Sequence, residues 1–183
     1  MTVAVTQIVK LTKIKTSVFA AAFTILAVLT PLAAHYFGGA AAGRLFLPMH
    51  FFVLAGALLA GWQAGLAIGV LTPLISYSLT GMPPAMVLPF VLIEVAAYGF
   101  LAGLFQQKFK NIWLSLAIAL VLGRMILFAG MILLSAKMPA MPYVLGAMKD
   151  GWRGIALQIL LVPFIVKMIS VFLKEENNLS SRA

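Results

Sequence analysis

The sequence contains no cysteine and few charged residues. The absence of cysteine excludes a disulfide framework, a thiolate metal site and a cysteine nucleophile. Asp, Glu, Lys and Arg together make up 9% of the 183 residues, whereas a soluble domain carries about 25%. This chain therefore has too little polar surface to coat a globule that faces water.

Sequence patterns typical of catalysis are also missing. There is no serine in a G-x-S-x-G turn, no H-E-x-x-H pair and no glycine-rich loop of the Walker A type. Glu94 has no acidic partner in its apolar stretch, which argues against chemistry by paired carboxylates. We therefore expect no enzyme, no catalytic residue, no bound metal and no cofactor.

What the chain has in abundance is hydrophobic sequence, at 63% of residues and a mean hydropathy of +1.10. A membrane-spanning helix needs about 20 apolar residues. We predict an all-α integral membrane protein, a single membrane domain over 1–183, built as a bundle of six transmembrane helices. The expected helices are 16–36, 46–60, 64–79, 86–105, 112–136 and 151–173, followed by a polar tail at 174–183.

Turn-forming residues set these boundaries. The first helix is followed by FGGAAAGR, and GWQAG divides an apolar stretch that is too long for one span. TGMPP ends the third helix, because Pro83 and Pro84 cannot continue it. QQKFKN and KEENN close the fourth and sixth helices. We predict that TGMPP forms a lid over a binding site, with a stiff connector as the alternative.

The net charge of +9 is best explained by membrane topology, because the basic residues flank the apolar stretches and are not interleaved with aromatic ones. We therefore expect contact with lipid headgroups and no nucleic-acid partner. With the N-terminus inside, eight basic residues lie on the inner side and four on the outer side, which predicts cytoplasmic termini. The inner residues are Lys10, Lys13, Lys15, Lys108, Lys110, Lys167, Lys174 and Arg182, and the outer ones are Arg44, Lys137, Lys149 and Arg153.

Polar residues inside membrane helices mark candidate functional positions, because a charge at a helix centre costs at least about 2.5 kcal/mol. Glu94 and Arg124 lie well inside the fourth and fifth helices, and His50 and Gln158 lie in the second and sixth. All four fall in the same half of the membrane at about 1.5 Å per residue. We expect a solute pocket there, completed by Tyr77 and Tyr98.

Each of these polar residues could instead serve the fold alone. Glu94 and Arg124 can form a structural ion pair between two helices. Gln158 can make an interhelical hydrogen bond, and His50 can be an interfacial histidine. The sequence leaves these roles open beside the role in a pocket.

Longer segments carry a resemblance to a known family. LPMHFFVLAGALLAGWQAGLAIGVLTPLISYSLTGMPP, PFVLIEVAAYGFLAGLF, VLGRMILFAG and GIALQILLVPFIVK occur in that order between Leu47 and Lys167. The series resembles the substrate-binding S components of energy-coupling factor (ECF) vitamin transporters.

The resemblance implies a protein of the prokaryotic plasma membrane that binds a water-soluble vitamin or related micronutrient on its outer face. It also implies a membrane coupling protein and two cytoplasmic ATPases as partners. S components commonly carry an A-x-x-x-A pattern on the first helix for the coupling protein. This chain offers instead Ser17 with Ala21 and Ala20 with Thr24, small residues that let helices approach closely. Ordinary packing inside the bundle is the alternative role for them.

Two other functions remain possible from the sequence. A self-sufficient small transporter or channel would need polar groups through both halves of the membrane, and a small membrane enzyme would need acidic metal ligands near the headgroups. The residues do not identify the solute: pantothenate, folate, cobalamin and pyridoxine are all compatible with a pocket that offers donors, acceptors and a cation.

Overall fold

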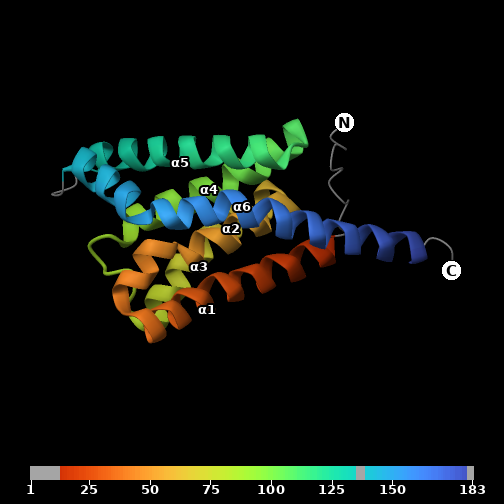
Figure 1. The fold of residues 1–183 in the computed structure, drawn as a ribbon, viewed down its shortest axis with the longest axis horizontal. Helices are drawn as coiled ribbons and strands as arrows, with labels where there is room; N and C mark the ends of the chain where they lie inside the picture. The colour runs from red at the N-terminus through yellow and green to blue at the C-terminus, as the bar shows by residue number, and fades with distance from the viewer. Residues whose placement is uncertain (1–12, 135–138, 181–183) are drawn as a thin grey trace.

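The computed structural model describes residues 13–134 and 139–180, and their side chains except at 40–44 and 174–180. It is a bundle of six helices (Figure 1). The helices are α1 (Lys13–Phe46), α2 (Pro48–Ala60), α3 (Trp62–Thr80), α4 (Leu88–Phe109), α5 (Ile112–Leu133) and α6 (Ala140–Ser180). The predicted all-α membrane bundle is confirmed.

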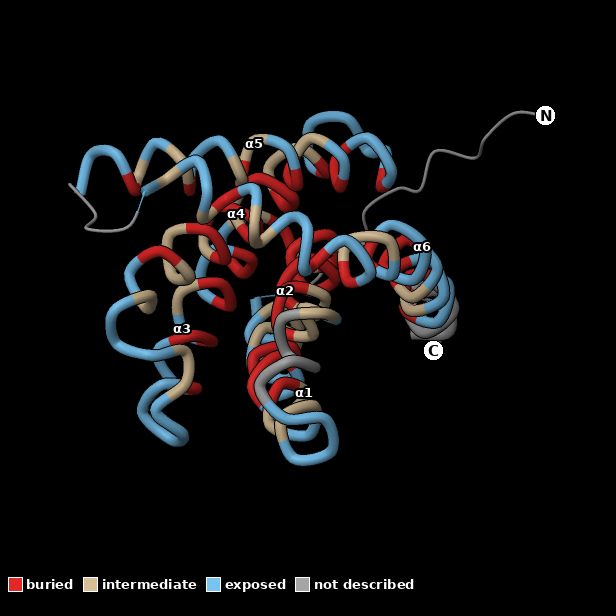
Figure 2. Tube along the Cα trace, turned by 60° about the vertical axis from the view of Figure 1, so that its left-hand side comes forward, coloured by how far each residue is buried: buried red, intermediate tan, exposed pale blue. Residues whose placement is uncertain are grey.

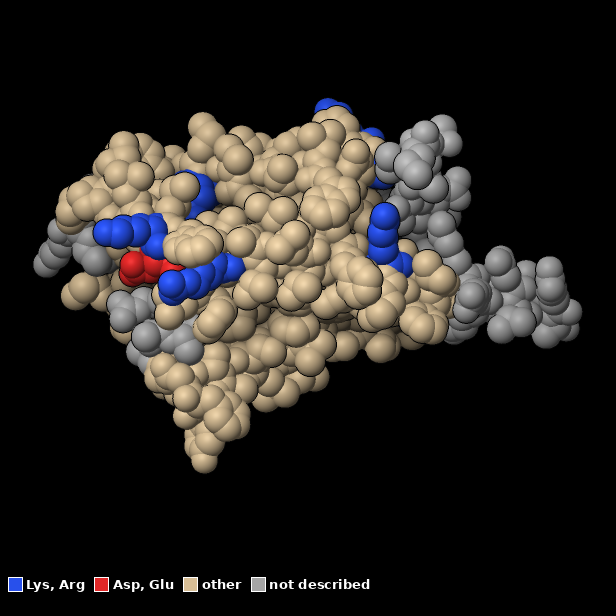
Figure 3. Space-filling view, viewed as in Figure 1, with Lys and Arg blue, Asp and Glu red and all other residues tan. Residues whose placement is uncertain are grey.

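Five of the six helices are long and apolar enough to cross a membrane, and α2, with 13 residues, is shorter. Large apolar side chains are exposed along the outer faces, among them Leu29, Val121, Leu160 and Phe164. Figure 3 shows charged side chains toward the two ends of the viewed face, with a broad uncharged band between them. An apolar exterior of this kind is stable in lipid and not in water.

The helix boundaries differ most from the prediction in α1 and α6. α1 continues to Phe46 through a kink at Gly39, whose φ of 63° suits glycine. α6 begins at Ala140 rather than 151 and runs to Ser180 rather than 173. Both helices are longer than predicted because polar residues and glycine, which lie beyond the apolar core of each helix, can still adopt helical backbone angles. α5 ends at Leu133, and the predicted end at 136 lies outside the described residues.

α2 lies at the centre of the bundle, where its buried backbone appears red in Figure 2. All seven residues from Val53 to Leu59 are buried. A helix that is apolar on every side is stable in this position because other helices surround it. Because α2 is enclosed by protein, its short length is compatible with the membrane.

α3 and α4 cross in very close contact. A Cβ added at Gly65 would collide with the backbone oxygen of Gly99, and one at Gly69 would lie 2.6 Å from the carbonyl oxygen of Val95. Glycines four residues apart expose the backbone on one helix face, so two helices can approach closely in a membrane. This contact fixes the position of α4 and of Glu94 on it.

α6 is fixed to the break between α1 and α2. A Cβ at Gly154 would lie 2.6 Å from the carbonyl oxygen of Phe46. One turn further on, the buried Gln158 donates from Nε2 to the carbonyl oxygen of Leu47 over 3.5 Å. Leu47 has a left-handed backbone with φ 47°, which turns the chain from α1 into α2.

The ends of the helices gather in two groups. At the left of Figure 1 lie the end of α1, the start of α2, the α3–α4 connection and the start of α6. The start of α1 and the end of α6 lie at the opposite end of the bundle. The structure thus separates a loop-rich end, where the site lies, from an end that holds the start of α1, the end of α6 and the short α2–α3 and α4–α5 connections.

Candidate functional site

A cavity of about 690 Å³ opens at the loop-rich end of the bundle. Its volume lies in the range of about 300–1,000 Å³ that is usual for small-molecule sites. α1, α2, α3, α4, α5 and α6 all contribute to its lining, together with the α3–α4 connection. The connection carries most of the TGMPP segment, of which Thr80, Met82, Pro83 and Pro84 line the cavity.

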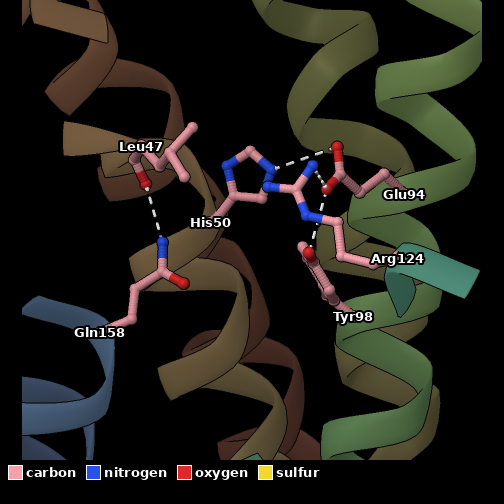
Figure 4. Close-up of polar contacts among 6 residues, drawn as sticks. All are labelled: Leu47, His50, Glu94, Tyr98, Arg124 and Gln158. Carbon is pink, nitrogen blue, oxygen red and sulfur yellow. Dashed lines mark hydrogen bonds and ion pairs between the residues drawn. The ribbon is translucent and has the colours of Figure 1, made fainter. Parts of the chain in front are cut away.

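Glu94 is the centre of a polar cluster that lines the cavity (Figure 4). Arg124 Nη1 lies 2.7 Å from Glu94 Oε1, and His50 Nε2 lies 3.8 Å from Glu94 Oε2. The Tyr98 hydroxyl donates to Glu94 Oε1 over 3.0 Å. α2, α4 and α5 therefore bring one carboxylate, one guanidinium and one imidazole together, as the common depth of these residues predicts.

The cluster is almost closed off from solvent but has unused hydrogen-bonding groups. The side chains of Glu94, His50 and Arg124 are only 8%, 10% and 11% exposed. Both ring nitrogens of His50 and the Nε of Arg124 are buried without a hydrogen-bond partner. Buried polar groups in proteins normally have partners, and one that does not calls for an explanation. The unpartnered nitrogens make this cluster the candidate binding position in the cavity.

Tyr98 supports the cluster without lining the cavity, and it is 2% exposed. Its ring meets the His50 ring edge-on at a centroid distance of 5.5 Å. It also lies where a Cβ at Gly123 would collide with it. α5 therefore carries a glycine next to Arg124, which makes room for the ring.

Two of the predicted pocket residues lie elsewhere. The Gln158 side chain extends to Leu47, to which it donates a hydrogen bond, and has no drawn contact with Glu94 (Figure 4). Tyr77 is 37% exposed and is not part of the lining. Successive helix residues differ by about 100° in direction, so its neighbour Ser76 lines the cavity instead. The structure thus gives Gln158 a hydrogen bond that ties α6 to the α1–α2 break.

The sequence prediction missed several lining residues. Tyr143 and Asp150 line the cavity from the first turns of α6, and His35 lines it from α1. The two α6 residues fall outside the sixth helix as the sequence predicts it, since that helix is expected to begin only at 151. Pro142 in the first turn of α6 is a start signal that could have indicated the longer helix.

The predicted partner face on α1 is divided in the structure. Ser17 and Ala21 are exposed one turn apart, and Ala20 is half-buried. Thr24 is 7% exposed and donates to the carbonyl oxygen of Ala20 over 2.8 Å. Thr24 therefore belongs to the interior of the bundle, while Ser17 and Ala21 remain on its surface.

The fold is that of a membrane helical bundle with a cavity at one end, whose walls are mostly apolar and which has a polar cluster among its lining residues. The sequence matches the family "ECF transporter, substrate-specific component" over residues 7–173, which is most of the chain. The chain belongs to this family. Comparison with curated proteins and with solved structures gave no match.

Family membership determines the cellular location of the chain and the kind of complex in which it takes part. It is a multi-pass protein of the prokaryotic plasma membrane that takes part in transport and is not an enzyme. Membership also implies association with an ECF energising module and with a substrate.

Proposed function

We propose that the chain binds a water-soluble vitamin or related micronutrient from the outer face, in the cavity that Glu94, Arg124 and His50 line. A coupling protein and two ATPases then drive uptake of the bound solute. The observation that carries the proposal is the cavity of about 690 Å³ with buried, unpartnered nitrogens at its polar end. Pockets with mostly apolar walls and a few convergent polar groups are typical of small-molecule binding.

The orientation follows from the distribution of basic residues. The sequence predicts eight basic residues on the side of the two termini and four on the opposite side, so the positive-inside rule favours an outward-facing cavity. A route through the other half of the membrane, which a self-sufficient transporter would need, has less support. Among the described residues, the buried acidic and basic side chains, Glu94 and His50, both line the cavity.

Mass spectrometry of small molecules that copurify with the protein tests the proposal. A Gly146→Trp variant blocks the cavity, because Gly146 lines it and nothing lies within 4 Å of an added Cβ. Leu145→Trp is the matched control, since Leu145 is 55% exposed and outside the lining. Wild type and L145W should retain the same solute, and G146W should lose it. Equal retention by all three proteins would place the solute elsewhere.

A further inference from the structure

We infer that the solute is an uncharged polar compound with a compact ring-like body, and that it is neither a carboxylate nor a cation. The inference rests on the proposed function and adds the class of the solute. It follows from how the charges, the unpartnered atoms and the walls of the cavity are arranged.

The charge of Arg124 is already neutralised within the protein. Its guanidinium lies 2.7 Å from Glu94 Oε1, and both side chains are almost fully buried. The Tyr98 hydroxyl donates to the same oxygen, which holds the carboxylate in place. The charges of Glu94 and Arg124 cancel, so this pair has no net charge to offer an ion.

The cluster would therefore not neutralise the charge of a charged solute. A carboxylate would have to compete with Glu94 for Arg124, and it would approach a second negative group in a nearly dry environment. A cation would approach the guanidinium. Asp150, the other acid in the lining, is exposed to water, so its charge is screened. The cluster thus disfavours ions of either sign.

The unpartnered atoms describe the group that fits. Arg124 Nε is a donor, and the two ring nitrogens of His50 are hydrogen-bonding groups without a partner. A hydroxyl or an amide edge, which both accepts and donates, matches this set. Such a group on the solute would form hydrogen bonds with buried groups that otherwise have no partner. Binding would thereby remove the free-energy penalty that these unpaired groups impose on the empty protein.

The walls describe the rest of the solute. Five prolines line the cavity, namely Pro31, Pro48, Pro83, Pro84 and Pro142. Their rings are rigid and apolar, and they come from three helices and the α3–α4 connection. Rigid walls favour a solute that is itself rigid, because less conformational freedom is lost on binding. A compact ring bearing hydroxyl or amide groups fits both the walls and the polar end.

The test adds defined solute fractions to the purified chain in lipid nanodiscs. Small molecules from yeast extract are separated on anion and cation exchangers at neutral pH into anionic, cationic and uncharged fractions. Thermal unfolding is then measured with each fraction, because a solute that binds the folded protein raises the melting temperature. We expect the uncharged fraction to raise it and the two charged fractions to leave it unchanged.

Two variants sharpen the result. Glu94→Gln leaves the charge of Arg124 without its partner, so the anionic fraction should now stabilise the protein. Gln107→Lys is the matched control, because it makes the same change in net charge on α4 at an exposed position outside the cavity lining. The control should keep the wild-type preference.

The outcomes separate this inference from the function on which it rests. Stabilisation of the wild type by the anionic or cationic fraction alone overturns the inference and leaves solute binding intact. If no fraction stabilises the wild type, and no solute copurifies with it, both the inference and the proposed function fail. The wild-type measurement decides between these results even if E94Q does not fold.

Discussion

Arg124 serves the fold and the cavity at the same time. It pairs with Glu94 across α4 and α5, yet its Nε is buried without a partner and it lines the cavity. Breaking a buried pair from one side typically costs about 3–5 kcal/mol of stability. Structural and binding effects of a substitution at this position must therefore be measured separately.

Arg124→Ala should weaken binding of the copurifying solute by roughly tenfold to a hundredfold. A hydrogen bond to a charged group contributes about 1.5–3 kcal/mol, and each 1.4 kcal/mol is about tenfold in affinity. Isothermal titration of the folded variant measures this loss. Wild-type affinity in a folded variant would show that Arg124 makes no contact with the solute.

The stability of the ion pair has its own test. Arg124→Ala and Glu94→Ala should each lower the melting temperature, because each leaves an unpaired buried charge. The double variant should recover much of the loss. Additive losses in the double variant would indicate that the two side chains stabilise the bundle independently of each other.

Tyr98→Phe should reduce solute affinity although Tyr98 does not line the cavity. The variant keeps the ring but removes the hydroxyl that donates to Glu94, so Glu94 and Arg124 lose part of their fixed geometry. We expect a loss of about tenfold, seen by titration. Tyr77→Phe removes an exposed hydroxyl outside the lining and serves as the control. Equal affinities of the two variants would show that the Tyr98 hydroxyl does not position Glu94 and Arg124 for binding.

At the scale of helices, the close contact between α3 and α4 fixes the position of the cavity wall that α4 forms. Gly65→Ala should destabilise the bundle by about 1–3 kcal/mol, since its methyl group collides with the Gly99 backbone. Gly146→Ala is the control, because nothing lies within 4 Å of its added Cβ. Thermal unfolding in nanodiscs compares the two. A G65A variant as stable as wild type would mean that α3 and α4 can separate without cost.

The α3–α4 connection borders the cavity through Met82, Pro83 and Pro84. As a lid, it should become more protected when the copurifying solute is added back. Hydrogen exchange at the amides of Ala85 and Met86 should slow, while exchange at Lys110, at the other end of α4, should stay the same. An unchanged rate at Ala85 and Met86 with solute bound would identify the segment as a stiff connector.

The sequence predicted the number and the cores of the helices better than their ends. Apolar stretches and turn residues such as TGMPP are local signals, and they placed α3, α4 and α5 closely. The first turns of α6 contact residues that are distant in the sequence: the Tyr143 ring lies 6.4 Å from the Phe90 ring of α4, centroid to centroid. Depth alone predicted that His50, Glu94 and Arg124 meet. It failed for Tyr77 because depth does not give the direction of a side chain around its helix.

At the scale of the whole molecule, the cavity and the proposed partner face lie at different ends. The cavity is at the loop-rich end, whereas Ser17 and Ala21 lie near the start of α1 at the other end (Figure 1). A partner docked there would leave the cavity mouth free. Binding and energised uptake should therefore be separable by substitution, which a transporter working alone would not allow.

Ala21→Trp should abolish uptake and preserve solute binding. Ala21 is exposed on α1, so the larger side chain faces outward and disturbs docking of a partner helix rather than the interior. Leu29→Trp, at an exposed position further along α1, is the matched control for added bulk. Titration of the isolated chain measures binding, and ATP-driven uptake in liposomes containing the energising module measures transport. Uptake by liposomes that contain this chain alone would refute dependence on a module and favour a self-sufficient transporter.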